Sequence, residues 1–340
     1  MFRIAALVLI EVLLATVLAQ EPPRRIGSID FYGYAGLDLD RIKAALPLHV
    51  GDQFPGPLET TDAIRKAVTS VTGHPPLDVA SVCCDAQGNF MIYVGLPGAS
   101  IKQSEYNRVP SGSTALPGEI VDLYKQIMNA SSAAVLKGDA RDDNSHGYAL
   151  SISDSDLRAK QLAARAYAIR HEKLIRTVLE TSSDVQHRLV AAYLLGYARQ
   201  SSRQIAALVH ATHDPDDSVR NDATRALGVL ASSSAKAAAR IPAGGFITML
   251  SSGSWTDRNK AGWVLTSLTK SRDPKLLARL RSEALESLIE MARWHDPGHA
   301  YSARILLARI AGIDDERAER LAHADNADEL INALGKRPHE

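Results

Sequence analysis

The sequence predicts a mainly α-helical protein in which a small α+β domain precedes an α-solenoid of about four helical pairs. From Ser183 to Ala231, helical patterns alternate with short charged breaks, and the two ends of this stretch resemble each other. Only 5% of the residues are aromatic, which suits helices packed through small and medium side chains. Strand-like patterns occur near the N-terminus, over residues 24–97. Self-similarity at such a period is typical of stacked helical repeats.

Composition limits the number of domains and the kinds of partner. A chain of 340 residues accommodates about two domains of ~100–200 residues each. Lys+Arg and Asp+Glu both count 39, so the net charge is zero with His neutral. A neutral chain has no overall field to collect nucleic acid or an anionic membrane. The sequence therefore predicts protein partners and no nucleic acid, and it leaves a local basic face and peripheral membrane contact open.

Residues 1–19 have the pattern of a secretory signal. Arg3 precedes an apolar run, and small residues lead up to a cut between Ala19 and Gln20. The alternative is an uncleaved membrane anchor, but the run is shorter than the ~20 residues of a spanning helix, and Glu11 interrupts it. We therefore expect export, with the periplasm as the destination.

Residues 24–97 predict a compact α+β domain with the order strand, helix, helix, strand, strand. The expected elements are a strand over 26–31, helices over 38–47 and 58–71, and strands over 77–84 and 90–96.

This order, together with His49-Val50-Gly51-Asp52, resembles the polypeptide-transport-associated (POTRA) domain over ~75 residues. The resemblance implies partner binding, in part by strand addition to a sheet edge. No series of barrel-type strands follows the single copy here, so a role in barrel assembly is not carried over.

Cys83 and Cys84 are adjacent and are the only cysteines. Successive side chains of a strand point to opposite faces, so one thiol can be buried while the other is exposed. A vicinal disulfide and an intermolecular bridge are the other two interpretations in an oxidising compartment. Without a C-x-x-C spacing the pair does not predict zinc.

Residues 98–150 are predicted to be a linker that contains one helix. Residues 98–116 are polar and rich in Gly and Ser, and Pro117 then begins a helix that ends at about Leu136. The following charged loop, 137–148, does not match the calcium-loop pattern. This composition predicts that the N-terminal domain is independent of the solenoid.

Residues 151–335 predict the repeat domain. The four expected helical pairs are 172–181 with 184–198, 204–212 with 216–231, 242–251 with 256–269, and 283–294 with 297–311. The second helices share an alanine that is followed four residues later by a leucine: Ala191 and Leu195, Ala223 and Leu227, Ala261 and Leu265, and Ala303 and Leu307. Since one pair cannot bury its apolar stripe alone, we expect the pairs to stack. A half-repeat over 154–170 and a polar-faced cap over 313–334 are expected at the two ends.

The segment 214–230, DPDDSVRNDATRALGVL, resembles the second half of a HEAT repeat. In that pattern an acidic turn precedes Val-Arg and then Ala and Leu at helical spacing. One arginine recurs per repeat beside the acidic turns at Asp184, Asp216 and Asp257: these are Arg188, Arg220 and Arg258. The resemblance implies structural Asp–Arg pairs at the turns and between repeats, and the alternative is an anion-binding row of arginines.

Two pairs of histidines are the candidate metal ligands: His210 with His213, and His295 with His299. Residues at such spacing share one face of a helix, but no third ligand follows from the spacing, and H-E-x-x-H is absent. The patterns G-x-S-x-G, G-x-x-x-x-G-K-[ST] and G-x-G-x-x-G are absent too. We therefore predict no catalytic residue, cofactor or metal.

Two functions follow. The first is a secreted, non-enzymatic scaffold that binds proteins in the cell envelope. The second is an enzyme, either a metal-dependent hydrolase or a HEAT-like lyase, that uses the His/Asp turns of the solenoid. The signal sequence argues against the lyase. Trp255, Trp263 and Trp294 lie in the last two repeats, where they serve either packing or recognition.

Overall fold

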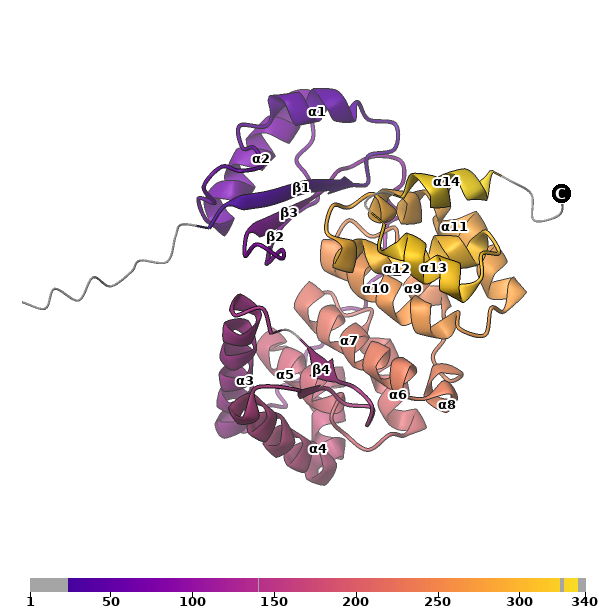
Figure 1. The fold of residues 1–340 in the computed structure, drawn as a ribbon. Helices are drawn as coiled ribbons and strands as arrows, with labels where there is room; N and C mark the ends of the chain where they lie inside the picture. Colours follow the sequence, from indigo (N-terminus) through magenta and orange to yellow (C-terminus); the bar gives the residue numbers. More distant parts are fainter. Residues whose placement is uncertain (1–23, 140, 325–326, 336–340) are drawn as a thin grey trace, which may run out of the picture.

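The computed structural model describes residues 24–139, 141–324 and 327–335. The fold is mainly helical with a small three-stranded sheet near the N-terminus, which confirms the predicted fold class (Figure 1). The predicted signal, 1–19, lies outside the described residues. Within the described residues, no helix is both long and apolar enough to cross a membrane.

The N-terminal domain, which we call the head, is a sheet with two helices on one face (Figure 1). Its strands are β1 (Ile26–Tyr32), β2 (Asp78–Cys83) and β3 (Phe90–Gly95), in the spatial order β1-β3-β2. Strand β3 lies in the middle, parallel to β1 and antiparallel to β2. Both β1 and β2 are therefore edge strands.

The two head helices begin and end at the residues that the sequence signals. Helix α1 (Leu39–Ala45) begins after Asp38, whose side chain accepts a hydrogen bond from the main-chain N–H of Arg41. Helix α2 (Pro57–Thr72) begins with a proline in its first turn and ends at Gly73, which adopts a left-handed conformation with φ 76°.

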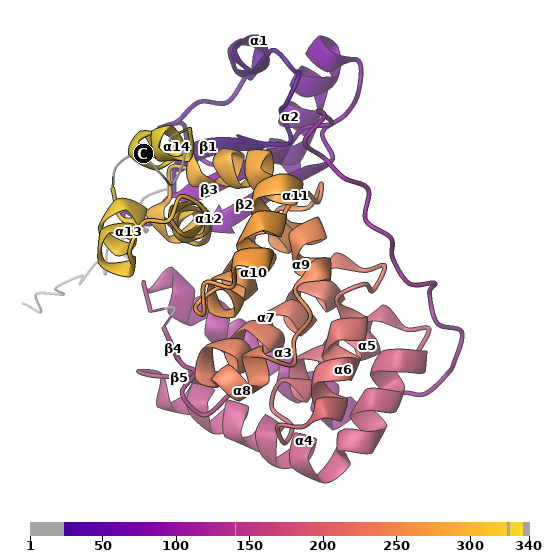
Figure 2. The ribbon, with the colours of Figure 1, turned by 90° about the vertical axis from the view of Figure 1, so that its right-hand side faces the viewer.

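The remaining helices form stacked pairs (Figure 2). They are α3 (Gly118–Leu136), α4 (Ser155–Thr181), α5 (Val185–Leu195), α6 (Ser202–Ala211), α7 (Asp217–Ser233), α8 (Ala235–Ala238), α9 (Gly244–Met249), α10 (Trp255–Leu268), α11 (Pro274–Ala292), α12 (Pro297–Ile310), α13 (Asp315–Ala322) and α14 (Asp328–Leu334). The second helices of successive pairs pack on one another, α5 on α7, α7 on α10 and α10 on α12.

The alanine and leucine anchors lie at these contacts. All eight are fully buried and belong to one continuous hydrophobic core: Ala191, Leu195, Ala223, Leu227, Ala261, Leu265, Ala303 and Leu307. Small and branched side chains at this spacing let neighbouring helices approach closely.

Three local features differ from the predicted boundaries. Helix α4 joins the expected half-repeat to the first repeat helix, with non-helical φ and ψ at His171 between them. Helix α11 begins at Pro274 rather than Glu283, because Asp273 caps it and proline fits its first turn. The region predicted as a charged loop contains a short hairpin, β4 (Asp142–Asp143) and β5 (Leu150–Ser151).

The head and the helical body share a core. Tyr32, Met91 and Tyr93 of the sheet belong to the same hydrophobic cluster as the repeat helices, while the opposite face of the sheet packs on α1 and α2 through a separate cluster. The head therefore sits against α10, α11 and α12 (Figures 1 and 2). This arrangement does not match the expectation of an independent head.

Residues 98–116 run as an extended strap along the ends of the repeat helices (Figure 2). Their main chain forms hydrogen bonds at three successive turns: Lys102 N to Ser251 O (2.9 Å), Asn107 N to His213 O (2.7 Å) and Gly112 N to Thr181 O (2.8 Å). The Tyr106 ring also covers the Arg220 guanidinium at 4.3 Å. A segment that is linker-like in composition is thus bound along its length.

Candidate functional site

The recurring arginines are buried and connect each repeat to the next. The three contacts are Arg188 Nε to Asp214 Oδ2 (2.8 Å), Arg220 Nε to Asp257 Oδ1 (3.0 Å) and Arg258 Nη1 to Glu290 Oε2 (3.0 Å). The nearer acids Asp184 and Asp216 instead accept hydrogen bonds from the first N–H groups of α5 and α7. Because the guanidinium charges are neutralised within the protein, this row is an inter-repeat connection rather than an open anion site.

Glu290 is the point where head, strap and repeats meet. Its carboxylate is 2% exposed and accepts hydrogen bonds from the main-chain N–H groups of Gly33 (2.7 Å) and Tyr34 (3.0 Å). The Ser100 hydroxyl on the strap (2.7 Å) and the Arg258 guanidinium (3.0 Å) donate to the same carboxylate. Charge-assisted bonds of this kind are about twice as strong as neutral ones.

A second carboxylate, Asp78 at the start of β2, fixes the head to α10. It accepts hydrogen bonds from the Tyr32 hydroxyl (2.9 Å) and from the main-chain N–H of Trp255 (2.8 Å). Burial raises the pKa of Asp78 and raises the pKa of the Tyr32 hydroxyl well above its usual value. The start of β2 is therefore held in place.

Aromatic side chains fill the junction between these two carboxylates. Tyr93 of β3 stacks on Trp255 with ring centroids 5.0 Å apart and meets Trp294 edge-on at 5.1 Å. His299 lies beside them, with its Nδ1 2.6 Å from the Tyr93 hydroxyl. These two tryptophans thus pack the head onto the repeats.

The candidate histidines do not come together as a metal centre. His295 Nδ1 lies 2.7 Å from Asp30 Oδ1 of β1, and this hydrogen bond raises the pKa of the imidazole. Burial lowers the pKa of His299. His210 and His213 lie at the strap, near Asn107. Among the described residues, no group of three or more His, Cys, Asp or Glu side chains is placed to hold a metal ion.

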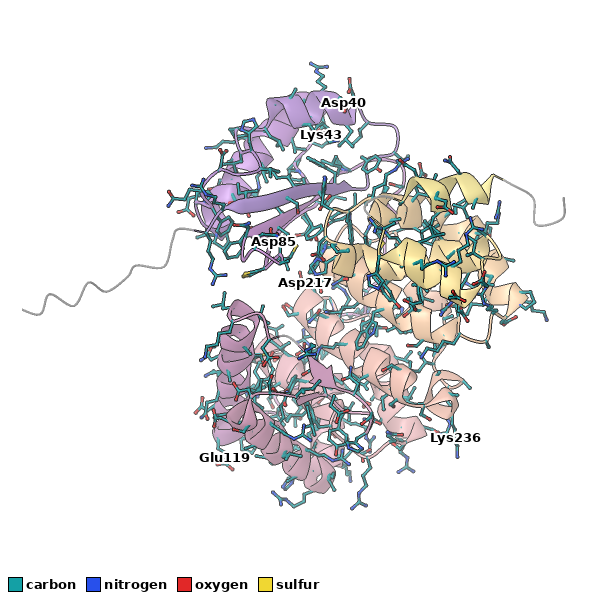
Figure 3. All side chains as sticks on the ribbon, in the orientation of Figure 1. Asp40, Lys43, Asp85, Glu119, Asp217 and Lys236 are labelled. Atoms are coloured by element: carbon teal, nitrogen blue, oxygen red, sulfur yellow. A yellow bond between two sulfur atoms is a disulfide. The ribbon has the colours of Figure 1, made fainter. Side chains whose placement is uncertain are left out.

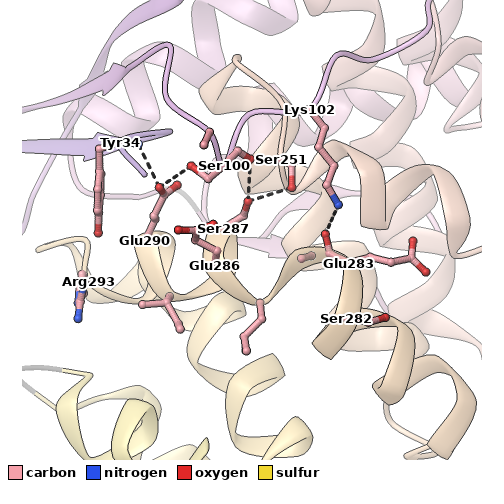
Figure 4. A pocket seen from close by; sticks show the side chains of 14 residues that line it. Tyr34, Ser100, Lys102, Ser251, Ser282, Glu283, Glu286, Ser287, Glu290 and Arg293 are labelled. Carbon is pink, nitrogen blue, oxygen red and sulfur yellow. Dashed lines mark hydrogen bonds between the residues drawn. The ribbon is translucent and has the colours of Figure 1, made fainter. Parts of the chain in front are cut away.

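A groove of about 550 Å³ lies between the strap and α11 (Figure 4). Its floor carries the hydroxyls of Ser251 and Ser287, 2.9 Å apart. Lys102 of the strap donates to the carbonyl oxygen of Glu283 at the rim. The hydroxyls have no imidazole beside them in the lining, so the groove lacks the nucleophile–base pair of an acyl-transfer site.

Strand β2 has a free edge. The main-chain N–H of Leu96 donates to the carbonyl oxygen of Tyr32, and that of Phe90 donates to the carbonyl oxygen of Arg25. The main-chain N–H and C=O groups of the even-numbered residues of β3 therefore point toward β1. The main-chain groups of the odd-numbered residues of β3 point toward β2, where these residues pair with Ala80 and Val82. By alternation, the main-chain groups of Val79 and Ser81 point to the outer side of β2. In the described part of the chain, no strand pairs with that side.

At the opposite end of β2, Cys83 and Cys84 form a disulfide with each other. Of the three interpretations that the sequence allowed, the structure contains the vicinal bridge. Arg24 donates to both sulfur atoms, at 3.1 Å and 2.7 Å.

Comparison with known proteins finds similarity among solved structures but not among families or curated sequences. No protein-family model matches the chain, and neither does any curated protein sequence. The fold is similar to the crystal structure of an engineered protein from the Northeast Structural Genomics Consortium, with 18% identity and a TM-score of 0.37. That match covers 64% of this chain and 96% of the engineered protein.

Asp78 and Glu290 are functional residues that no sequence motif marks. A signal for Glu290 was present, because each repeat arginine pairs with an acid 26, 37 or 32 residues further along the chain. Asp78 had no such signal, since its partner Trp255 lies in the repeats and is distant in sequence.

Proposed function

We propose that this protein is an exported, non-enzymatic scaffold that binds protein partners in the cell envelope. The observation that carries the proposal is the free edge of β2 on a firmly anchored head. An edge strand presents unpaired N–H and C=O groups, and a partner segment can extend the sheet by pairing with them. The POTRA resemblance of the head supports this mode of binding.

The anchoring of β2 favours binding without rearrangement. Asp78 attaches one end of the strand to α10, and the disulfide with Arg24 lies at the other end. Each residue of Asp78–Cys83 is partly exposed, and no strand of the described residues pairs with the outer side of β2. Six residues span about 20 Å at ~3.3 Å per residue, which sets the length of a segment that could pair.

The stack of helical pairs suits the same function. Repeat proteins of this kind present extended surfaces to partners. The HEAT resemblance of 214–230 supports this assignment, and the strap and the Glu290 contacts hold the repeats and the head as one body. The proposal that the protein is exported depends on the signal-like pattern of residues 1–19.

Photo-cross-linking in native cells tests the proposal. A photo-reactive residue at Gln87, at the exposed hairpin tip beside β2, should capture discrete protein partners, whereas Glu59 on α2 and Arg203 on α6 serve as distant positions. Ser81→Pro removes a main-chain N–H on the outer side of β2 and should abolish capture. Ser81→Ala keeps that N–H and should leave capture unchanged. Equal capture in both variants would reject strand addition, and no discrete partner at any position would reject the scaffold.

A further inference from the structure

A second concave site lies inside the helical body. A cavity of about 360 Å³, which we call the inner cavity, is bounded by α3, the β4–β5 hairpin, α4, α5, α7 and α10. This volume is at the lower end of the ~300–1,000 Å³ typical of ligand sites. It is separate from the β2 edge, so an inference about it does not depend on the proposed function.

The charged groups of the inner cavity differ in how they are paired. Arg225 forms an ion pair with Asp142 of the hairpin. Asp222 accepts hydrogen bonds from Asn221 Nδ2 (3.1 Å) and from the Tyr124 hydroxyl (3.4 Å). Lys260 on α10 lines the same cavity and has no hydrogen bond or ion pair within the described ranges. A half-buried ammonium with unused donors is costly unless something binds it.

The electrostatic environment limits which anion can bind. Burial raises the pKa of Asp222 to about 6 and lowers that of Lys260 to about 8. At neutral pH, Lys260 remains mostly protonated, and three carboxylates, Asp139, Asp142 and Asp222, line the same space. These carboxylates would repel a dianion such as phosphate more than a single carboxylate.

Apolar side chains form another part of the cavity lining. Met128 and Val135 of α3 and Leu157 of α4 line it. Two neighbouring apolar side chains are exposed to solvent, Leu136 by 50% and Ile152 by 54%. Leu136 and Ile152 directly follow the lining residues Val135 and Ser151 in the chain, so exposed apolar side chains are available to a ligand that continues beyond the cavity.

We propose that the inner cavity binds the C-terminal carboxylate of a polypeptide that ends in an apolar residue. The carboxylate would accept hydrogen bonds from the Lys260 ammonium, and the terminal side chain would pack on Met128, Val135 and Leu157. The Asp222 carboxylate would accept from the main-chain N–H of the bound segment. Preceding residues would leave over Leu136 and Ile152.

Calorimetric titration of the full chain tests this assignment. The probes are N-acetyl-alanyl-leucine, its C-terminal amide, and 4-methylpentanoate, a free acid with the same apolar group. We expect the peptide acid to bind at least about tenfold more tightly than the amide, because the amide lacks the charge that Lys260 recognises. The free acid should bind more weakly than the peptide acid, because it lacks the main-chain N–H.

Variants of Lys260 locate the site. Lys260→Gln should weaken binding of the peptide acid by about tenfold or more, and Lys260→Arg should retain most of it. Lys236 on α8 is exposed and points away from the body, so Lys236→Gln is the matched control and should bind as the unmodified chain does (Figure 3). Circular dichroism shows whether each variant is folded.

Three results would overturn the proposal. These are no heat of binding up to millimolar peptide, equal affinity for the acid and the amide, and full affinity in a folded Lys260→Gln protein. Equal affinity for 4-methylpentanoate and the peptide would reject a polypeptide ligand in favour of a small organic acid. If Lys260→Gln does not fold, the acid and amide probes on the unmodified chain decide the matter.

Discussion

Buried charged groups occur both at the junction between head and repeats and in the inner cavity. The two regions differ in how many hydrogen bonds and ion pairs these groups form. At the junction, Glu290 accepts four hydrogen bonds and Asp78 accepts two, and aromatic rings surround them. In the inner cavity, Lys260 has no hydrogen bond or ion pair within the described residues, and Asp222 has an upward-shifted pKa. The charged groups of the junction therefore hold the fold together, whereas Lys260 in the inner cavity has donors left for a ligand.

This difference separates structural charge from charge that is available to a ligand. Removing one partner from a buried, paired charge costs stability, because the other partner is left uncompensated. Removing a charge that lacks a partner costs little or is favourable, and proteins retain such groups at functional sites. The following experiments test this distinction.

The largest effect is expected from removal of residues 1–150, which include the head, the strap, α3 and β4. The sequence predicts that residues 151–340 fold alone, but in the structure this fragment would expose Trp255 and Trp294 and leave Glu290 without its head and strap donors. We expect a fragment with helical far-ultraviolet circular dichroism but without a cooperative thermal transition. A transition as sharp and as high as that of the full chain would show that the junction does not support the repeats.

Glu290→Gln should have the next largest effect. The substitution keeps the size of the side chain but leaves the buried Arg258 charge uncompensated, so we expect a loss of about 3–5 kcal/mol in the free energy of unfolding. Glu286→Gln is the matched control, because this glutamate lies on the same helix and is exposed. Urea denaturation measures both variants. A loss below about 1 kcal/mol for Glu290→Gln would mean that the pair is not structural.

Asp222 should give a smaller, pH-dependent effect. Its pKa is raised to about 6 in the folded protein, above the ~3.9 of an unfolded aspartate, so the folded state binds more protons in this interval. The contribution of Asp222 to stability should therefore fall as pH rises from about 4 to about 6. We expect the stability difference between the unmodified chain and Asp222→Asn to change by about 1–2 kcal/mol over that range. A difference that does not vary with pH would contradict the buried state of this carboxylate.

The parts of the fold that the sequence predicted are those that local patterns encode. The anchors from Ala191 to Leu307 follow a helical period, and Asp38 and Pro57 mark helix starts. The docking of the head was not predictable in this way, because Asp78 and Trp255 meet only through tertiary structure. Composition also gave no sign that the strap is bound, since its contacts are made largely by main-chain groups.

The candidate sites were less predictable for the same reason. The histidine pairs are sequence neighbours, yet their partners are Asp30, Tyr93 and the strap rather than each other. The inner cavity combines Asp222 and Lys260 from two different repeats with the end of α3. No local pattern relates these residues, so only the fold brings them together.

The most direct test of the distinction between the two sites is the free energy of unfolding of Lys260→Met, measured by urea denaturation at pH 7 together with binding of N-acetyl-alanyl-leucine. Methionine fills a similar volume without the charge. If Lys260 is retained for a ligand, the variant should be as stable as the unmodified chain or more stable, and binding should be lost. A loss of about 3 kcal/mol or more, like that expected for Glu290→Gln, would contradict the distinction and make Lys260 a structural residue.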